Sequence, residues 1–398
     1  MKKFILIFLM LAAVSGNAQW VQVPNNISGM INSFASINND IFTGTYIVLN
    51  NITINSPGVY RSTNNGVNWT QTSFPNFAGS LHVKGTRLFA TSIGGSSSFY
   101  SDNSGANWTN MNMQCYSFTS NNTHLYAATG TGLKISTNNG LNWTTINSSV
   151  TPIMLVKDNF VLATAGSTLL IVSSNNGLNW SNANGISNAV QSLATNGTEI
   201  YAGTYSGGVL KSTDNGFNFT QTSSFNGYQL NSIIADGTNV IAGSSSGGGI
   251  FVSTNKGTNW TLKNEGFNGG SASISKLLYA NGYIFAGEGS QVWRRNFQNL
   301  LPVKNITTEI PSKYSLGQNY PNPFNPTTVI SFQLPVVSDV SIKIYDVQGR
   351  EVQMLVNERM QAGMYEVSFD GSGLTSGVYF YQMRAGKYIE TKRMILLK

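Results

Sequence analysis

The sequence predicts an all-β protein, a seven-bladed β-propeller closed by an N-terminal strand and followed by a small β-sandwich. Short runs of Thr, Val, Ile, Tyr and Phe, separated by Gly and Asn, recur along the 398 residues and are typical of strands joined by turns. An eight-residue pattern returns six times along two-thirds of the chain. No long helical periodicity follows the N-terminal segment, which argues against a helical fold.

The repeated pattern, called the box below, reads Ser-x-[Asp/Asn]-x-Gly-x-x-[Trp/Phe]. Its glycines recur every 35–41 residues. The six boxes are Ser62, Asn64, Gly66 and Trp69; Ser101, Asn103, Gly105 and Trp108; Ser136, Asn138, Gly140 and Trp143; Ser173, Asn175, Gly177 and Trp180; Ser212, Asp214, Gly216 and Phe219; Ser253, Asn255, Gly257 and Trp260.

Each box lies within a longer unit of four expected strands, shown most clearly by residues 189–194, 199–203, 208–212 and 219–222. Four short antiparallel strands repeated at this period are the signature of a β-propeller. A single four-stranded unit cannot bury its faces alone, so the units are expected to stack around an axis.

The ends of the repeat predict how the ring closes. Residues 274–279, 283–287 and 291–295 match the first three strands of a unit, but no box follows them. Residues 19–23 resemble the fourth strand at 68–72. We therefore expect the N-terminal segment to complete a seventh blade and to remove an exposed sheet edge.

The box resembles the Asp-box, or BNR repeat, of sialidases, sortilin-type receptors, xyloglucan hydrolases and photosystem assembly propellers, over residues 19–297. The resemblance implies a structural turn between the third and fourth strands. The Ser and Asx side chains can accept hydrogen bonds from the turn, the Gly allows an unusual backbone conformation, and the Trp or Phe anchors the turn. Five of the six boxes carry Asn and only Asp214 keeps the acid, which argues against a catalytic or metal-binding role.

The N-terminal residues 1–18 read as a secretory signal peptide, with two lysines, an apolar run and small residues before a cleavage site after Ala18. No later run reaches the length of a transmembrane helix. Cys115 is the only cysteine, so no internal disulfide can form. The net charge of +7 is scattered, which does not indicate a nucleic-acid surface.

The C-terminal region reads as a different module. Residues 300–313 are expected to be a linker, and residues 314–398 an immunoglobulin-like β-sandwich. This region resembles the type A C-terminal sorting domain of the type IX secretion system. The matching residues include Tyr320, Pro321, Asn322, Pro323, Phe324, Asn325 and Pro326. The resemblance implies a Bacteroidota-type bacterium, the type IX machinery as a partner, and a secreted or cell-surface location.

The inventory of reactive side chains disfavours an enzyme. Glycoside hydrolysis needs two facing carboxylates, and turns or boxes account for all acids before residue 299 except Glu265 and Glu288. Those two are the candidate catalytic residues. His82 and His124 have no metal-ligand spacing, and no phosphate-binding loop or dinucleotide fingerprint occurs, so no metal or cofactor is expected.

We therefore expect a non-enzymatic module that binds a glycan or a protein, or serves a structural role. The alternative is an Asp-box-type glycoside hydrolase acting on extracellular polysaccharide. The expected binding face lies opposite the box turns, with Tyr205, Phe225, Tyr228 and Phe267 as candidates.

Overall fold

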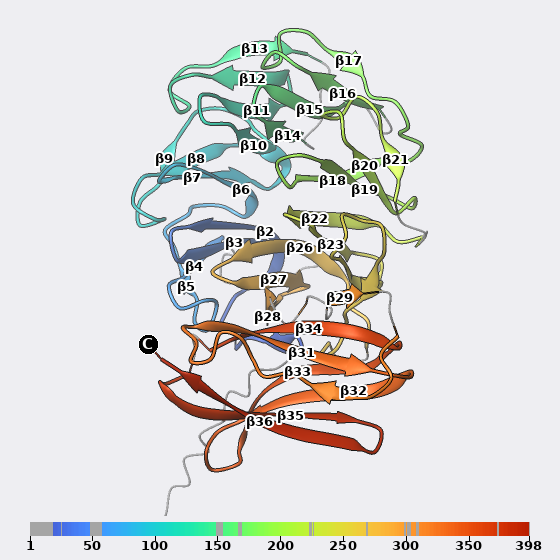
Figure 1. Cartoon of the computed structure of the whole chain (residues 1–398). Helices are drawn as coiled ribbons and strands as arrows, with labels where there is room; N and C mark the ends of the chain where they lie inside the picture. The colour runs from blue at the N-terminus through green and yellow to red at the C-terminus, as the bar shows by residue number, and fades with distance from the viewer. Residues whose placement is uncertain are drawn as a thin grey trace, which may run out of the picture. The chain divides into compact units, whose positions relative to one another are not determined.

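A computed structural model describes residues 19–24, 26–47, 58–148, 154–165, 169–222, 225, 227–267, 270–297, 300, 304–307, 310–371 and 374–397. The predicted signal peptide lies outside these residues. The chain divides into two compact units, Gln19–Leu301 and a second unit that includes Pro302–Lys398. Almost all regular structure is β (Figure 1). In the described part of the chain, no helix has the length and apolar character that crossing a membrane requires.

Unit 19–301 contains seven four-stranded antiparallel sheets among the described residues. The first three sheets comprise β2 (Met30–Ile37), β3 (Asp40–Tyr46), β4 (Val59–Ser62) and β5 (Thr70–Gln71); β6 (Ala78–Lys84), β7 (Arg87–Ser92), β8 (Ser98–Ser101) and β9 (Thr109–Asn110); β10 (Ser117–Ser120), β11 (Leu125–Thr129), β12 (Gly132–Ser136) and β13 (Thr144–Asn147). A short 3-10 turn, η1 (Ile93–Gly95), joins β7 to β8.

The next three sheets repeat this order. They comprise β14 (Met154–Lys157), β15 (Phe160–Ala165), β16 (Leu169–Ser173) and β17 (Ser181–Asn182); β18 (Val190–Thr195), β19 (Ile200–Thr204), β20 (Val209–Ser212) and β21 (Thr220–Gln221); β22 (Leu230–Asp236), β23 (Asn239–Ser244), β24 (Gly249–Ser253) and β25 (Thr261–Leu262).

The last sheet combines the two ends of the unit. It consists of β26 (Ile274–Ala280), β27 (Tyr283–Glu288), β28 (Gln291–Asn296) and the N-terminal β1 (Val21–Gln22). Val21 pairs with Arg294 and Gln22 with Trp293. The N-terminal strand thus occupies the position at which the sequence pattern lacks a fourth strand.

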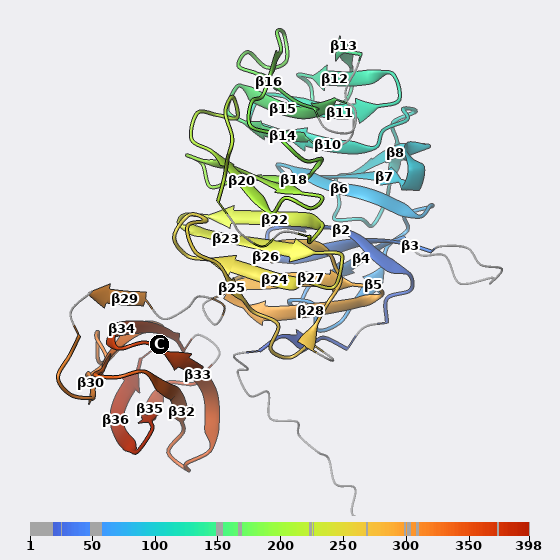
Figure 2. The same ribbon diagram turned by 90° about the vertical axis from the view of Figure 1, so that its right-hand side faces the viewer.

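The first strands of the sheets contact one another in chain order, from β2 through β6, β10, β14, β18 and β22 to β26, and β26 contacts β2. These strands surround the middle of the unit, and the later strands of each sheet lie further out (Figures 1 and 2). Apolar side chains fill the spaces between neighbouring sheets. Phe42, Leu88 and Phe99, for example, share one cluster between the first and second sheets.

Cys115 is buried in the cluster that includes Phe89 and Phe118. Burial raises the pKa of its thiol, so the thiol stays protonated and packs as a small apolar group.

The second unit is built from two further four-stranded sheets. One comprises β29 (Lys304–Thr307), β34 (Gly363–Asp370), β31 (Thr327–Leu334) and β30 (Ser315–Leu316); the other comprises β33 (Glu351–Met360), β32 (Ser338–Tyr345), β35 (Gly377–Ala385) and β36 (Tyr388–Leu396). Both sheets contribute to one apolar cluster that includes Ile330, Phe332, Ile342 and Tyr381.

Two elements of this unit differ from the sequence-based expectation. β29 lies inside the segment expected to be a linker, and it pairs with β34. The backbone groups of β34 would otherwise stay unpaired along that edge, which explains the pairing. Within residues 314–398, expected as a β-sandwich, the ten-residue β33 pairs with β32 although its sequence lacks a sustained polar–apolar alternation.

Candidate functional site

The six boxes form nearly identical hydrogen-bonded turns. In each, the Ser Oγ accepts a bond of 2.8–2.9 Å from the Gly N–H and donates one of 2.7–3.0 Å to the Asx Oδ1. The Asx Oδ1 also accepts a bond of 2.8–2.9 Å from the backbone N–H four residues later. The box oxygens are therefore engaged within the turn itself.

Two consecutive residues of each box have left-handed backbone conformations. In the box of β20 and β21, Asn215 has φ 62° and Gly216 has φ 96°. A Cβ on Gly216 would lie 2.5 Å from Leu162 of the preceding sheet. The glycine is thus required both by the turn and by close packing.

The boxes are also bonded to the preceding sheets through basic side chains. Arg294 donates to the carbonyl of Asn65, Arg87 to that of Asn139, and Lys211 to that of Lys256. These carbonyls belong to the left-handed residue before the box glycine. The box turns are consequently held together by internal contacts.

Most of the acids near the box turns are neutralised by ion pairs. Asp40 lies 2.6 Å from Arg61, and Asp102 lies 2.6 Å from Arg87. Glu199 lies 3.4 Å from Lys256. Burial alone would raise the pKa of Glu199, but hydrogen bonds from Asn196 and other donors outweigh burial and lower it. The lowered pKa of Glu199 is the opposite of what a general acid held protonated near neutral pH requires.

The two candidate catalytic residues are held differently. Glu265 forms an ion pair of 2.8 Å with the buried Arg295. Arg295 pairs with Ile284 in β27, whereas Glu288 lies at the far end of the same strand. That offset of four residues corresponds to roughly 13 Å along a strand. Arg295 neutralises Glu265 at one end of β27, and Glu288 lies at the other end of that strand. These contacts therefore do not bring the two carboxylates face to face.

The histidines do not form a metal site. His82 Nε2 lies 2.8 Å from Ser120 Oγ, and His124 Nδ1 lies 2.8 Å from Thr123 Oγ1. Desolvation, with a smaller contribution from Lys84, lowers the pKa of His82 to about 4. No cluster of metal-ligating side chains occurs among the described residues.

The opposite end of the unit carries a feature that the sequence patterns did not reveal. Five of the seven first strands contain a β-bulge near their start, at Asn32, Gly79–Ser80, Gln191, Asn231 and Ser275. A bulge redirects side chains and is frequent beside binding sites. The bulges place mainly short polar side chains around the start of the innermost strands.

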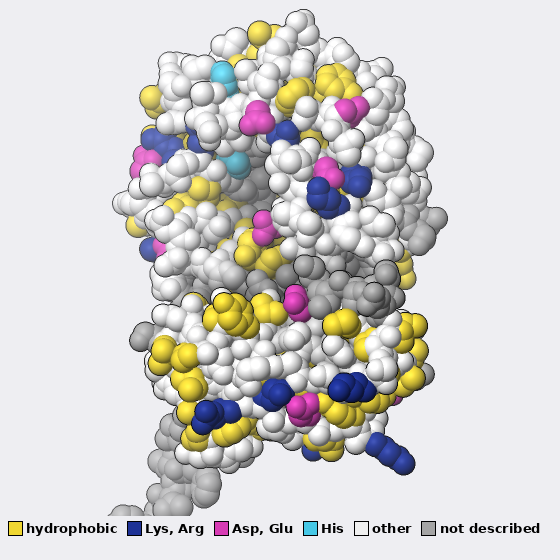
Figure 3. Space-filling model, viewed as in Figure 1, with side chains coloured by type: hydrophobic (Ala, Val, Ile, Leu, Met, Phe, Trp, Pro, Cys, Tyr) yellow, Lys and Arg dark blue, Asp and Glu magenta, His cyan; other side chains and the backbone are white. Residues whose placement is uncertain are grey.

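The polar side chains at the bulges also connect neighbouring sheets. Asn32 Nδ2 donates to Gly79 O at 2.8 Å, and Gln229 Nε2 donates to Gln191 Oε1 at 3.4 Å. Figure 3 views the opposite end of the unit, where acidic side chains and the histidines lie around a hollow between the innermost strands. We call the end that carries the bulges the bulge end, and the end that carries the boxes the box end.

The aromatic residues expected on the binding face have different environments. Tyr205 is 56% exposed. Tyr228 is half-buried, and Phe225 stacks on Phe251 with 4.2 Å between ring centroids. Phe267 is only 5% exposed and stacks on Trp20, so its prediction as a surface residue was wrong. Its neighbour Trp20 comes from the distant N-terminal segment, which sequence reasoning did not place there.

Tyr116 was not predicted as a binding residue, although it is 43% exposed. It immediately precedes β10 and so lies at the start of an innermost strand. The sequence offered a signal in the form of an aromatic residue just before an expected first strand. Tyr116 and Tyr205 thus give this end exposed rings with hydroxyl groups, suited to polar ligands.

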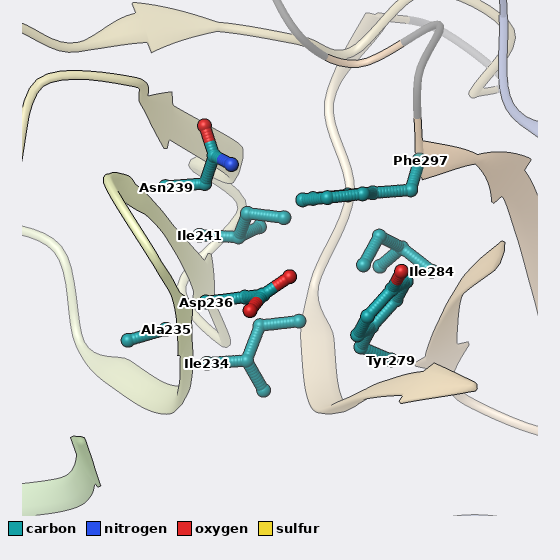
Figure 4. A pocket seen from close by; sticks show the side chains of 8 residues that line it. All are labelled: Ile234, Ala235, Asp236, Asn239, Ile241, Tyr279, Ile284 and Phe297. Carbon is teal, nitrogen blue, oxygen red and sulfur yellow. The ribbon is translucent and has the colours of Figure 1, made fainter. Parts of the chain in front are cut away.

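Two cavities lie outside the bulge end. One of about 380 Å³ lies beside the first two boxes and is lined by Arg61, Asn64, Asn68, Ser73 and Ser104, among others. The other, of about 30 Å³, lies where Asp236 and Ile241 face Tyr279, Ile284 and Phe297 (Figure 4). The smaller cavity has room for about one water molecule and is not a ligand site.

Comparison with known proteins identifies the second unit and the fold of the first. Residues 318–397 match the family described as the secretion system C-terminal sorting domain. This sorting domain implies type IX secretion and export to the cell surface or the extracellular space. Among curated proteins, no sequence matches the chain.

Solved structures similar to the chain include β-propellers. YCF48 from Cyanidioschyzon merolae has a TM-score of 0.55 at 13% identity, covering 71% of this chain and 100% of that one. YCF48 bound to D1 peptide has a TM-score of 0.54 at 12% identity, covering 70% and 96%. The GH74 xyloglucanase from Xanthomonas campestris has a TM-score of 0.54 at 13% identity, covering 87% of this chain and 63% of that chain. These likenesses indicate a β-propeller fold.

Proposed function

We propose that this chain is an exported, seven-bladed, Asp-box-type β-propeller whose bulge end binds a glycan without cleaving it. The pairing of β1 with β28 and the contact between β26 and β2 support a closed ring of seven blades. The repeated turn network supports the Asp-box assignment.

The observation that carries the binding proposal is the contrast in charge between the two ends of the ring. The acids Asp40, Asp102, Asp158, Glu199, Asp214 and Asp236 all fall in boxes or in turns between first and second strands. At the bulge end the bulge residues are Asn32, Gly79–Ser80, Gln191, Asn231 and Ser275, and the acid beside them is Glu288, which pairs with Ile274. Amides, hydroxyls and exposed aromatic rings suit the hydroxyl groups and apolar faces of sugars.

The absence of turnover is proposed from the state of the carboxylates. Glu265 is engaged by Arg295, and the acids of the boxes and first turns lie at the box end. A hydrolase would need two opposed carboxylates with separate acid and base roles. Glu288 remains, and one carboxylate cannot supply both roles.

A binding and turnover assay tests this proposal. The purified propeller, residues 19–301, is measured against a panel of extracellular polysaccharides by affinity electrophoresis, and products are followed by reducing-end analysis. We expect retardation by at least one glycan and no released sugar. Turnover that Glu265→Gln or Glu288→Gln abolishes would establish the hydrolase alternative instead.

We propose that residues 314–398 form the sorting domain and that residues 300–313, whose strand β29 pairs with β34 of this domain, join it to the propeller. Within this domain, the proline-rich motif is bonded to the C-terminal strand. Asn322 Oδ1 accepts a bond from Ile395 N–H, and Phe324 N–H donates to the Ile395 carbonyl. Leu397 N–H donates to the Phe324 carbonyl. The motif and the chain end therefore form one surface for the secretion machinery.

Export is tested by truncating the chain after Leu300 and measuring the protein in the medium and on the cell surface. We expect the truncated chain to accumulate inside the outer membrane. Export at the level of the full chain would contradict the sorting role.

A further inference from the structure

We infer that the bulge end recognises an acidic sugar, with Lys276 binding its carboxylate and Asn231 accepting a hydrogen bond from a sugar hydroxyl. This inference rests on the proposed glycan-binding function and narrows it to a ligand class. Two groups on neighbouring innermost strands carry the inference. The Lys276 ammonium forms no ion pair among the described residues, and the buried Asn231 Oδ1 has no hydrogen-bond partner among them.

Lys276 lies on β26, directly after the bulge at Ser275. Its ammonium donates to the backbone carbonyl of Asn231 at 3.3 Å. Among the described residues, no carboxylate forms an ion pair with it. Burial lowers the pKa of Lys276, which shows that its charge is held in a poorly solvated place. An anion at this position would offset the cost of that desolvation.

Asn231 supplies the second observation. It is the bulge residue of β22, in the sheet next to Lys276. Its Oδ1 is buried and has no hydrogen-bond partner among the described residues. Since such an acceptor costs free energy when left unpaired, a ligand hydroxyl that donates to it would be stabilising.

The innermost strands as a group favour an anion. They carry Lys84, Lys157, Lys276 and His82, and their one acid among the described residues is Asp236, the last residue of β22. Lys84 is bonded to the carbonyls of Asn121 and Asn122. Lys157 is bonded to Asn215 and lies 3.7 Å from Asp158. Of these three lysines, Lys276 is the one at the bulge end.

The two groups together specify the chemistry of the ligand. The ammonium requires an oxyanion, and the amide oxygen requires an O–H donor beside it. A uronic acid offers both, whereas sulfate offers only the anion and a neutral sugar only the hydroxyl. The neighbouring Gln191, Gln229 and Tyr228 are suited to contact the adjoining sugar units.

The test compares trigalacturonate with a neutral galactose trisaccharide by isothermal titration calorimetry on the propeller at constant ionic strength. We expect trigalacturonate to bind at least tenfold more tightly. Lys276→Gln should remove that difference and Lys276→Arg should retain most of it. Asn231→Asp should weaken trigalacturonate binding at least tenfold, because the new carboxylate would pair with Lys276. The matched control is Lys134→Gln, which removes a lysine bonded to Thr145 on β13, outside the innermost strands.

The outcomes separate this inference from the proposed function. Equal binding of the two trisaccharides, or loss of preference in Lys134→Gln as well, overturns the acidic-sugar inference but leaves glycan binding standing. If neither trisaccharide and no polysaccharide of the panel binds, the acidic-sugar inference and the proposed glycan binding are both overturned. Competition by sulfate at the same affinity overturns the role of the hydroxyl. Thermal unfolding of each variant checks that the propeller remains folded.

Discussion

The two ends of the propeller use similar polar residues for opposite purposes. At the box end, Ser, Asx and Gly lie at fixed spacing and satisfy one another within each turn, as Ser212, Asp214 and Gly216 do. At the bulge end, Asn32 and Gln229 bond across to neighbouring sheets, and the Asn231 Oδ1 has no partner among the described residues. Local satisfaction of the turn groups suits the first end to a structural role, and the proposed ligand would pair the Asn231 oxygen at the second end.

The largest expected effect concerns a contact between two segments that are distant in the chain. Trp20 is 1% exposed, donates to the Lys263 carbonyl at 2.7 Å and stacks on Phe267. Trp20→Ala should lower the free energy of unfolding by about 3–5 kcal/mol, the usual loss for a buried aromatic residue. Denaturant unfolding of the two proteins measures this loss of free energy.

The neighbouring Val21 is 37% exposed and provides the control, since Val21→Ala should change stability little. Equal losses in the two variants would contradict the proposed closure. Trp69 belongs to the first box, in a sheet formed by one continuous segment. Trp69→Ala should lower the free energy of unfolding as much as Trp20→Ala if the sheet that combines the two chain segments is structurally equivalent.

A pH-dependent effect is expected from His82, on the innermost strand β6. Its pKa is about 4 in the folded protein, below the ordinary value of 6.5. As pH falls below 6.5, the unfolded chain takes up a proton first, so stability should decline until about pH 4. The limiting loss is about 3 kcal/mol at 1.36 kcal/mol for each pH unit.

Thermal unfolding from pH 7 to pH 4 measures this effect. His82→Gln should flatten the decline, whereas His124→Gln, in the turn before β11, should preserve it. An unchanged slope in His82→Gln would show that other groups cause the decline.

A smaller effect distinguishes the serines of the two ends. Ser212 is 1% exposed, and Ser212→Ala removes the acceptor for the Gly216 N–H and one of the donors to Asp214 Oδ1. We expect a loss of about 1–3 kcal/mol in the free energy of unfolding. The Ser206 hydroxyl donates to Asn188 from a loop near the surface, and Ser206→Ala should cost less than about 0.5 kcal/mol. Similar losses would contradict the proposed difference between the ends.

The smallest effect tests whether the box needs charge. Asp214 Oδ1 accepts bonds from Ser212 and from the Asn218 N–H, as an amide oxygen does in the other five boxes. Asp214→Asn should therefore change stability by less than about 0.5 kcal/mol, measured by denaturant unfolding. Asp214→Ala removes the acceptor and should cost about 1 kcal/mol. A large loss in Asp214→Asn would assign a role to the carboxylate itself.

Sequence reasoning predicted the local features of this protein better than its long-range ones. The four-strand order and the position of the N-terminal strand followed from repeated spacing, because equivalent sequences adopt equivalent places in a repeat. The burial of Phe267 was missed because its partner Trp20 is distant in the chain. The bulges were missed because Asn32 and Gln191 occupy otherwise ordinary strand sequences. β29 was missed because its pairing depends on the edge of β34.

The amino-acid sequence by itself determined the turns, the repeat and the sorting domain, because each rests on residues close together in the chain. Tertiary structure alone decided which polar groups remain unsatisfied. Lys276 and Asn231 lie on different sheets, and their approach depends on how those sheets pack and where their bulges fall. Hydrogen-bond satisfaction and desolvation are properties of the packed chain, so the proposed binding site emerges only there.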